Sequence, residues 1–315
     1  MRRERARGQA SRARRGHASV SSVPHRETPV ALTIAGSDSG GGAGIQADLK
    51  AFARCGVHGA SAITAITAQS TVGVHAVHQV PARIVLAQVR AVLEDIRIDA
   101  VKVGMLGDVE TIEAVARALD ELPAGTPVVV DPVMVAESGA RLLAQSAQQA
   151  LAAEILPRAT VLTPNLPEAA VLAGVDCEPE AAVLAGGDRE PEAAVLAGGD
   201  REPEALARSV LALGPRIVVL TGGHRASATD LFLDAAGDGA VVAITGVRHA
   251  DGAAHGSGCT HSSVLAAQLA LGEPPLQAAR VARRMAGEAV ARGLRGLGAG
   301  AGPVDVLDLE RMRDA

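Results

Sequence analysis

Aromatic residues are almost absent from this sequence. Its 315 residues include no tryptophan, no tyrosine and two phenylalanines, and Lys50 and Lys102 are its only lysines. Proteins that bind single-stranded nucleic acid stack the bases on aromatic side chains, so this composition argues against nucleic acid as a partner. No apolar run approaches the ~18 residues that suggest a membrane span, so we expect no membrane partner either. The core must be built from aliphatic side chains.

Cysteine is also scarce. The three cysteines, Cys55, Cys177 and Cys259, are far apart and include no C-x-x-C pair. An odd number at such spacing argues against a disulfide framework and against a thiolate metal site. We therefore expect a reducing, cytoplasmic location.

Charge is unevenly spread along the chain, although the net charge is only −5. Residues 1–28 contain eight arginines and two glutamates. This composition resembles an organellar transit peptide or a nucleic-acid-binding tail, but it shows neither apolar periodicity nor the apolar region of a secretion signal. We interpret residues 1–28 as a disordered extension and residues 29–315 as one domain.

From residue 29 onward, short Val/Ile-rich runs alternate with stretches of helical periodicity. The predicted strands are 30–35, 60–68, 100–103, 128–130, 160–162 and 217–220. The predicted helices follow Gly44 and cover 84–95, 109–122, 146–156 and 261–271. Runs that are apolar on both faces are typical of buried parallel strands, so we predict an α/β three-layer sandwich with a mostly parallel sheet. Ligands of such sheets bind at the carboxyl ends of the strands.

A 12-residue unit is repeated in tandem within this pattern. Residues 166–177 resemble 178–189, and residues 190–201 repeat the sequence EPEAAVLAGGDR of 178–189 without change. Each copy has proline near a possible helix start and glycine at its end. We interpret residues 178–201 as an insertion that lengthens a surface helix or loop within the one domain.

A glycine-rich turn, G-S-D-S-G-G-G-A-G at 36–44, follows the first predicted strand. Glycines allow backbone N–H groups to approach a ligand, and a helix N-terminus adds positive charge. Residues 42–47 fit the G-x-G-x-x-A pattern of a dinucleotide site, which favours an oxidoreductase. Such a site requires an acidic residue after the second strand, whereas this strand ends at Gln69, whose amide suits the edge of a heteroaromatic ring. A tight connection without any ligand is the remaining alternative.

The turn Gly256-Ser257-Gly258-Cys259 precedes a predicted helix. Successive backbone amides at a helix start form an anion-binding nest that suits a phosphoryl group. At this position the helix terminus would lower the pKa of Cys259, which would accept a proton or hold the attacking hydroxyl in line. The alternative is that Cys259 is a small buried apolar residue. The flanking glycines favour a phosphoryl-transfer centre.

Oxygen-bearing side chains follow two other strands. Asp131 ends the run 128–130, and Asn165 and Glu168 lie three residues apart after the run 160–162. Carboxylate and amide oxygens suit Mg²⁺, although Asn165 alone equally suits a helix cap. A further loop, T-G-G-H at 221–224, is placed to pass near a triphosphate. No P-loop motif occurs, and the histidines near these turns lack zinc-ligand spacing.

Six motifs occur together, in the order of one known family. They are A-G-S-D at 35–38, G-G-A-G-I-Q-A-D at 41–48, K-V-G-M-L at 102–106, D-P-V-M at 131–134, T-P-N-L-P-E-A at 163–169 and H-G-S-G-C-T at 255–260. By these motifs and their order, the chain closely resembles the hydroxymethylpyrimidine/phosphomethylpyrimidine kinases of thiamine biosynthesis, over about residues 29–300.

The resemblance implies an ATP- and Mg²⁺-dependent enzyme of ribokinase-like fold. Its substrates would be 4-amino-5-hydroxymethyl-2-methylpyrimidine and the monophosphate of that compound. The pyrimidine pocket would be lined by Gly36, Asp48, Gln69 and Met105. The anion hole would comprise Gly256, Ser257, Gly258 and Cys259, with Cys259 where related sugar kinases have an aspartate base. Asp131 and Glu168 would face the metal, and Asn165, Thr221 and Gly223 the nucleotide.

Two departures from the family pattern concern cations near the triphosphate. Residues 136–139 read A-E-S-G where relatives commonly have A-K-S-G, and Thr221 replaces the lysine of a K-G-G-H loop. Their loss would weaken ATP binding or the second phosphorylation unless arginines compensate. Two alternatives therefore stay open: a pyridoxal kinase of the same superfamily and a catalytically silent pyrimidine-binding relative. Gln69 and Met105 favour the pyrimidine. We expect a small-molecule substrate and a homodimer.

Overall fold

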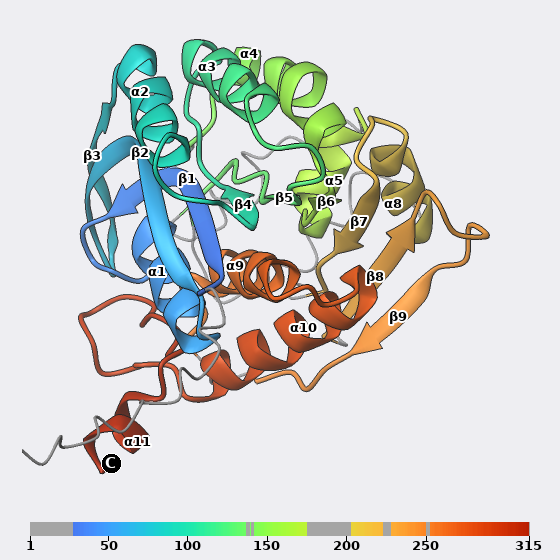
Figure 1. Cartoon of the computed structure of the whole chain (residues 1–315). Coiled ribbons are helices and arrows are strands. Elements are labelled where there is room, and N and C mark those ends of the chain that lie inside the picture. The colour runs from blue at the N-terminus through green and yellow to red at the C-terminus, as the bar shows by residue number, and fades with distance from the viewer. Residues whose placement is uncertain are drawn as a thin grey trace, which may run out of the picture.

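The computed structural model describes residues 28–136, 139, 142–174, 203–222, 228–249 and 253–314. Residues 1–27 of the Arg-rich extension and all of the insertion 178–201 lie outside the described residues. The described part of the chain contains a nine-stranded sheet in the order β3-β2-β1-β4-β5-β6-β7-β8-β9. Helices cover both faces of this sheet, as the prediction of a three-layer sandwich requires (Figure 1).

Six neighbouring strands of the sheet are parallel. They are β1 (Val30–Asp38), β2 (His58–Ser70), β4 (Ala100–Val103), β5 (Val128–Val130), β6 (Val161–Leu162) and β7 (Ile217–Leu220). Side chains alternate between the two faces, so that Val128 and Val130 join one apolar core while Val129 joins the other. Burial on both faces explains the continuous apolar runs, and the predicted parallel sheet is confirmed.

Three antiparallel strands complete the sheet and were not predicted. They are β3 (Gly73–Gln79), β8 (Thr229–Asp234) and β9 (Val242–Thr245). The edge strand β3 includes the exposed residues His75 and His78 and has no continuous apolar run. Its formation therefore depends on pairing with β2 rather than on its own composition.

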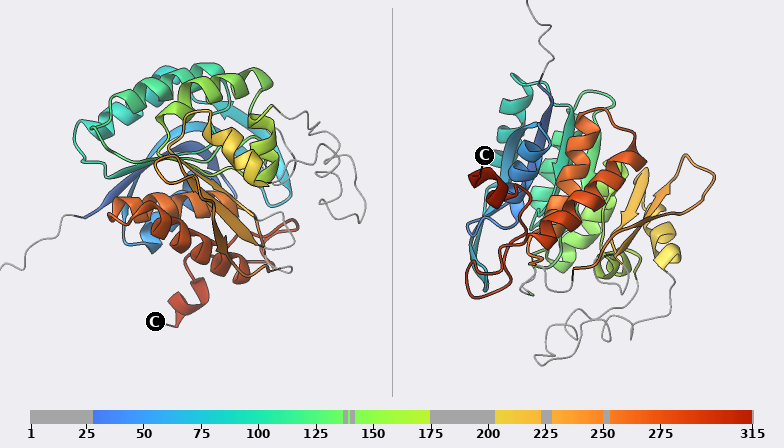
Figure 2. Two further views of the ribbon diagram at one scale, coloured as in Figure 1. Left: turned by 90° about the vertical axis from the view of Figure 1, so that its right-hand side faces the viewer. Right: turned by 90° about the horizontal axis from the view of Figure 1, so that it is seen from below.

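The helices form two layers, which are separated by the sheet in Figure 2. One layer contains α1 (Gly44–Arg54), α9 (Ser257–Ala270) and α10 (Pro275–Ala291). The other contains α2 (Ala82–Leu93), α3 (Val109–Asp120), α4 (Gln145–Ala150), α5 (Leu166–Leu172) and α8 (Pro203–Leu211). A π-helical turn (Leu151–Ile155) and a 3-10 turn (Leu156–Arg158) follow α4, and a short helix, α11 (Leu309–Arg313), lies near the C-terminus. No helix among the described residues is long and apolar enough to cross a membrane.

Candidate active site

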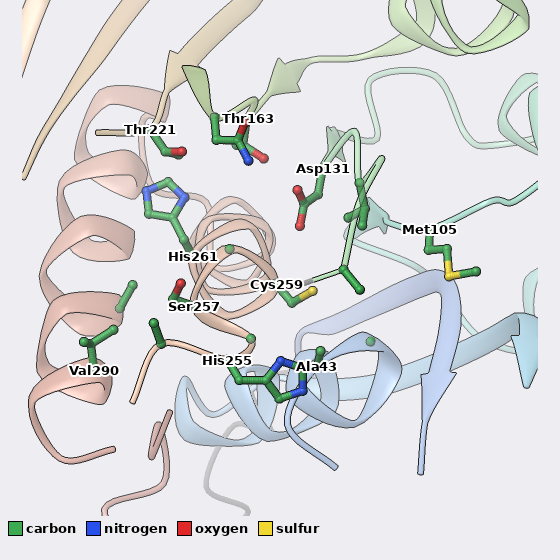
Figure 3. A pocket seen from close by; sticks show the side chains of 18 of the residues that line it. Ala43, Met105, Asp131, Thr163, Thr221, His255, Ser257, Cys259, His261 and Val290 are labelled. Atoms are coloured by element: carbon green, nitrogen blue, oxygen red, sulfur yellow. The ribbon is translucent and has the colours of Figure 1, made fainter. Parts of the chain in front are cut away.

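A cavity of about 420 Å³ lies at the carboxyl ends of the parallel strands. Eleven of the residues predicted to form the site line this cavity: Gly36, Gln69, Met105, Asp131, Asn165, Glu168, Thr221, Gly256, Ser257, Gly258 and Cys259. Met105, Asp131 and Cys259 face the same hollow from three different elements (Figure 3). Gly223 and Glu137 lie outside the described residues. The fold therefore brings together residues that are distant in the sequence.

Four backbone amides of the glycine-rich turn bind Asp38. Asp38 Oδ1 accepts the Gly40 N–H at 2.8 Å, and Oδ2 accepts the Gly42 and Ala43 N–H groups at 3.0 and 2.8 Å. The Gly41 N–H donates to the backbone carbonyl of Asp38 at 2.9 Å. All four donors are consumed within the protein. This corrects the expectation that these amides approach a ligand, and it removes the basis for the dinucleotide site.

The same carboxylate joins this turn to the start of α9. His255 Nε2 lies 3.0 Å from Asp38 Oδ2. Burial acts to raise the pKa of Asp38, but the contact with His255 and the donated amides outweigh it, so that the pKa is lowered. Gly256 has a φ of 81°, and a Cβ atom at this position would collide with the Gly42 carbonyl oxygen. Glycine is therefore required at Gly256 both for its backbone conformation and for the close approach of the two turns.

Helix α9 starts at Ser257, with Gly256 as its N-cap, four residues earlier than the predicted start at 261. The Ser257 N–H donates to the Ala254 carbonyl at 2.9 Å. Gly258 and Cys259 lie in the first turn of the helix, where N–H groups have no acceptor within the helix. The amides of Gly258 and Cys259 therefore lie at the cavity wall without an acceptor in the helix.

Cys259 differs from its prediction in its ionisation. Burial raises the pKa of the thiol to about 12, and the carboxylates of Asp131 and Asp48 add to the rise, while Lys102 and the Gly44 N–H oppose it. The expected lowering by the helix terminus is thus wrong, because burial dominates the pKa of the thiol. Cys259 carries a neutral thiol at physiological pH.

Asn165 and Glu168 form the cap of helix α5. Asn165 Oδ1 accepts the Glu168 N–H at 2.8 Å, and Glu168 Oε2 accepts the Asn165 N–H at 2.9 Å. The cap interpretation of Asn165 is confirmed, and it fixes both side chains at the cavity. Burial and the nearby Asp131 carboxylate raise the pKa of Glu168 to about 8. The Thr221 N–H donates to the Pro164 carbonyl at 2.9 Å, which holds the end of β7 beside this cap.

Asp131 lies on the floor of the cavity. Its Oδ2 accepts a hydrogen bond from Ser262 Oγ at 3.0 Å and lies 3.8 Å from Lys102 Nζ. Burial raises the pKa of Asp131 with a contribution from Asp48, while Lys102 and Ser262 oppose the rise. Burial disfavours the charge of Lys102, but the attraction of Asp48, Cys259 and Asp131 outweighs it and raises the pKa of the ammonium.

Asp48 does not line the cavity, although the family resemblance implied that it would line the pyrimidine pocket. It is fully buried and accepts hydrogen bonds from Thr33 Oγ1 and Ser263 Oγ, both at 2.6 Å, and from Lys102 Nζ at 3.0 Å. These donors use both oxygens of its carboxylate. Asp48 therefore forms part of the structure beneath the cavity and is not available to a substrate there.

Sequence reasoning missed several residues at the cavity. Besides Asp38 and Lys102, the cavity is lined at its other end by Asp230, His261 and Arg283. His261 Nε2 lies 3.1 Å from Asp230 Oδ2, and Arg283 Nε lies 3.9 Å from Asp230 Oδ1. Charged residues are rarely buried without a partner or a function, so the signal in the sequence was Lys102 within the predicted apolar strand 100–103.

Comparison with known proteins places the chain in a family. The family model for phosphomethylpyrimidine kinase matches residues 38–305. A hydroxymethylpyrimidine/phosphomethylpyrimidine kinase of Rhizobium meliloti is 45% identical over 88% of this chain and 96% of its own length.

Solved structures of related kinases share the fold. A Bacillus subtilis pyridoxal kinase in complex with ADP is 33% identical, with a TM-score of 0.72 over 90% of this chain and 99% of that one. A Clostridium difficile phosphomethylpyrimidine kinase is 35% identical, with a TM-score of 0.62 over 81% of this chain and 96% of that one. The chain therefore belongs to the phosphomethylpyrimidine kinase family, whose members are small-molecule kinases with a ribokinase-like fold.

Proposed function

We propose that this protein transfers the γ-phosphoryl group of ATP to the hydroxymethyl group of 4-amino-5-hydroxymethyl-2-methylpyrimidine, and then a second phosphoryl group to the monophosphate. The observation that carries this proposal is that one cavity contains Gln69 and Met105 together with the start of α9. A heteroaromatic acceptor and a transferring phosphoryl group would thus lie side by side. The name of the Rhizobium meliloti relative supports the same pair of reactions.

Gly36, Gln69 and Met105 form the proposed pyrimidine side. A Cβ atom on Gly36 would lie 3.1 Å from Met105 Sδ, so glycine leaves room for a flat ring beside the thioether. The Thr67 hydroxyl donates to the Ser37 carbonyl at 2.8 Å and shares this hydrogen with Gln69 Oε1 at 3.2 Å, so that the amide is held beside β2. An amide held in this way suits hydrogen bonds with the ring nitrogen and amino group of the pyrimidine.

The start of α9 forms the proposed phosphoryl side. The amides of Gly258 and Cys259 would stabilise charge on the transferring group, with Gly256 and Ser257 shaping the turn. Phosphoryl transfer has a loose transition state that depends chiefly on positioning and charge stabilisation. A neutral thiol cannot accept a proton, so Cys259 would hold the attacking hydroxyl in line rather than act as its base. The hydroxyl oxygen bonds to the γ-phosphorus as the bond from that phosphorus to ADP breaks, and the hydroxyl proton passes to an oxygen of the transferred phosphoryl group and from there to water.

Asp131 and Glu168 are the proposed ligands of Mg²⁺. Burial raises the pKa of both carboxyls, and the Asp131 carboxylate adds to the rise at Glu168, so a bound divalent cation would stabilise their charged forms. No group of three or more potential metal-ligating side chains occurs among the described residues, so nucleotide phosphates and water would complete the coordination. The metal would neutralise charge on the phosphates when bound. Asn165, Thr221 and Gly223 are the proposed nucleotide contacts, Gly223 remaining a prediction from the sequence.

Arg283 is the proposed substitute for the missing lysines. It extends from α10 into the cavity that Thr221 also lines, and its Nε has no hydrogen-bond acceptor among the described residues. Arginine binds phosphate as well as lysine does, so this side chain could contact the nucleotide phosphates. The substitution at Thr221 is therefore compatible with ATP binding.

We also propose that the protein is a homodimer and is located in the cytoplasm. Apolar side chains are exposed on both faces and at the turn of the β2–β3 hairpin, where Ile66, Val72 and Val77 are 52%, 58% and 44% exposed. Contact with a second copy would remove this surface from water. Light scattering of the purified protein tests the dimer by its mass.

Pyridoxal is the second candidate substrate, because the Bacillus subtilis structure with a TM-score of 0.72 is a pyridoxal kinase. The experiment measures ADP release with Mg-ATP and either the pyrimidine or pyridoxal. We expect a higher kcat/KM for the pyrimidine. A higher value for pyridoxal would reverse the assignment, and measurable pyrimidine binding without turnover of either compound would indicate a silent relative.

A further inference from the structure

Lys102 is a fully buried cation on strand β4, and it borders the floor of the cavity beside Asp131. Its Nζ lies 3.0 Å from Asp48 Oδ1 and 3.8 Å from Asp131 Oδ2. The two carboxylates differ in their surroundings, since Asp48 is sealed in the protein whereas Asp131 lines the cavity. One ammonium is thus shared between an internal acid and an acid that faces the site.

We propose that Lys102 is a positioning residue that holds the Asp131 carboxylate in place on the cavity floor. The inference rests on the role proposed above for Asp131. Ser262 Oγ holds the same oxygen, Oδ2, at 3.0 Å, so Lys102 and Ser262 restrain Asp131 from two elements, β4 and α9. The other carboxylate oxygen of Asp131 is left for the cavity.

The surroundings of Lys102 are shaped to bring its ammonium to this position. A Cβ atom on Gly104 would lie 2.9 Å from Lys102 Nζ and 3.0 Å from Ala35 Cβ, so glycine leaves room for the end of the lysine. Thr33 pairs with Lys102 in the register of β1 and β4, and its hydroxyl binds Asp48 at 2.6 Å. Asp48 in turn anchors Nζ through both oxygens, at 3.0 and 3.2 Å.

The net charge of Lys102, Asp48 and Asp131 allows a positioning role of Lys102 to be distinguished from a purely structural one. The lysine and the two aspartates together carry one net negative charge, which would attract a cation to the cavity. A buried ion pair by itself contributes little stability compared with apolar residues of similar size. If Lys102 served Asp48 alone, replacing both members of that pair would leave the site intact. If Lys102 also positions Asp131, the same replacement would damage the site.

The test compares Lys102→Met with the double variant K102M/D48N and with Asp48→Asn alone. K102M leaves two unpaired carboxylates and is expected to lose stability. The double variant keeps the net charge of the wild-type cluster, and we expect its melting temperature to recover most of the loss. Its kcat should nevertheless stay about 10–100-fold below wild type, the scale of a misplaced catalytic group, with the pyrimidine KM changed less than about threefold. Asp48→Asn, which keeps Lys102, should lose less kcat than the double variant.

Recovery of kcat to within about twofold of wild type in K102M/D48N would overturn the proposal, since Lys102 would then serve only Asp48. If that variant does not fold, K102M/D48S replaces it, because serine leaves room for a water molecule between the Thr33 and Ser263 hydroxyls. Calorimetry of ATP binding with and without Mg²⁺ gives a second measurement. The gain in affinity from Mg²⁺ should be smaller in the double variant, and an unchanged gain would also overturn the proposal.

The calorimetric measurement does not depend on turnover of the pyrimidine. A wild-type protein that binds Mg-ATP but does not phosphorylate the pyrimidine would contradict the proposed substrate alone. In that protein, the effect of replacing Lys102 on the gain in ATP affinity from Mg²⁺ would still test whether Lys102 positions Asp131.

Discussion

His255 and Asp38 are 217 positions apart in the sequence, yet His255 Nε2 lies 3.0 Å from Asp38 Oδ2. Asp38 also gathers the amides of Gly40, Gly42 and Ala43. One carboxylate therefore joins the turn beside the proposed pyrimidine side to the residue that precedes the N-cap of α9. We infer that this contact sets the distance between the two sides of the site.

The His255–Asp38 contact should matter more for kcat than for binding. His255→Leu removes the donor, and we expect kcat to fall about 10–100-fold, because a small misplacement of reacting groups has effects of this size. His255→Gln keeps an N–H donor near the position of Nε2 and should retain most of the activity. Steady-state kinetics and the melting temperature of both variants check this. Equal losses in the two variants, or a loss of kcat explained by unfolding, would contradict the positioning role.

The ionisation of Cys259 can be measured by alkylation. Since burial raises the pKa of the thiol to about 12, the thiolate fraction in the ligand-free protein should increase about tenfold per pH unit from pH 7 to 9.5. The rate of iodoacetamide modification of the Cys259 peptide, followed by mass spectrometry, should rise in parallel without a plateau. A plateau below about pH 8 would indicate the lowered pKa expected from the helix terminus.

Glu168 should lower stability at alkaline pH in the absence of Mg²⁺. Its folded-state pKa is raised from 4.5 to about 8, so the folded protein favours the protonated form. The penalty for ionisation is absent below pH 4.5, grows between pH 4.5 and 8, and is complete above that range. Glu168→Gln keeps an acceptor for the Asn165 N–H and cannot ionise. Its melting temperature relative to wild type should therefore rise from pH 5 to pH 9, and a constant difference would contradict the raised pKa.

Arg283 should contribute to ATP binding. We expect Arg283→Met to raise the KM for ATP about 10–100-fold, because a charge-assisted hydrogen bond to phosphate is worth roughly 1.5–3 kcal/mol. Arg284→Met is the matched control, since the Arg284 side chain is 62% exposed and pairs with Glu288 on the same helix. Equal KM values for ATP in the two variants would show that Arg283 does not compensate for the lysine that Thr221 replaces.

The central part of the fold could be predicted from sequence because its physical cause is local. Strands such as β5 and β7 are buried on both faces and therefore read as unbroken apolar runs. Strand β3 has no such run, and it depends on its partner β2. Helix α9 was predicted to begin too late, because glycine at 256 and 258 has low helix propensity although it is tolerated at a helix start.

The set of cavity-lining residues could largely be predicted, whereas their contacts could not. Eleven of the predicted site residues line the cavity because motifs that follow parallel strands meet at one edge of the sheet. Asp48 differs, because its pairing with Lys102 crosses 54 positions and depends on which strands are neighbours. The pKa of Cys259 likewise depends on enclosure by distant elements. The run of glycines after Asp38 was a signal for a side-chain-stabilised turn, since aspartate often binds backbone amides just ahead of it.

The mass of the product tests the proposed pair of phosphorylations directly. The full chain is incubated with Mg-ATP and 4-amino-5-hydroxymethyl-2-methylpyrimidine, and the pyrimidine species are followed over time by mass spectrometry. We expect a species with one added phosphoryl group to form first and then to be converted into a species with two. An unmodified pyrimidine under conditions in which the protein phosphorylates pyridoxal would contradict this expectation.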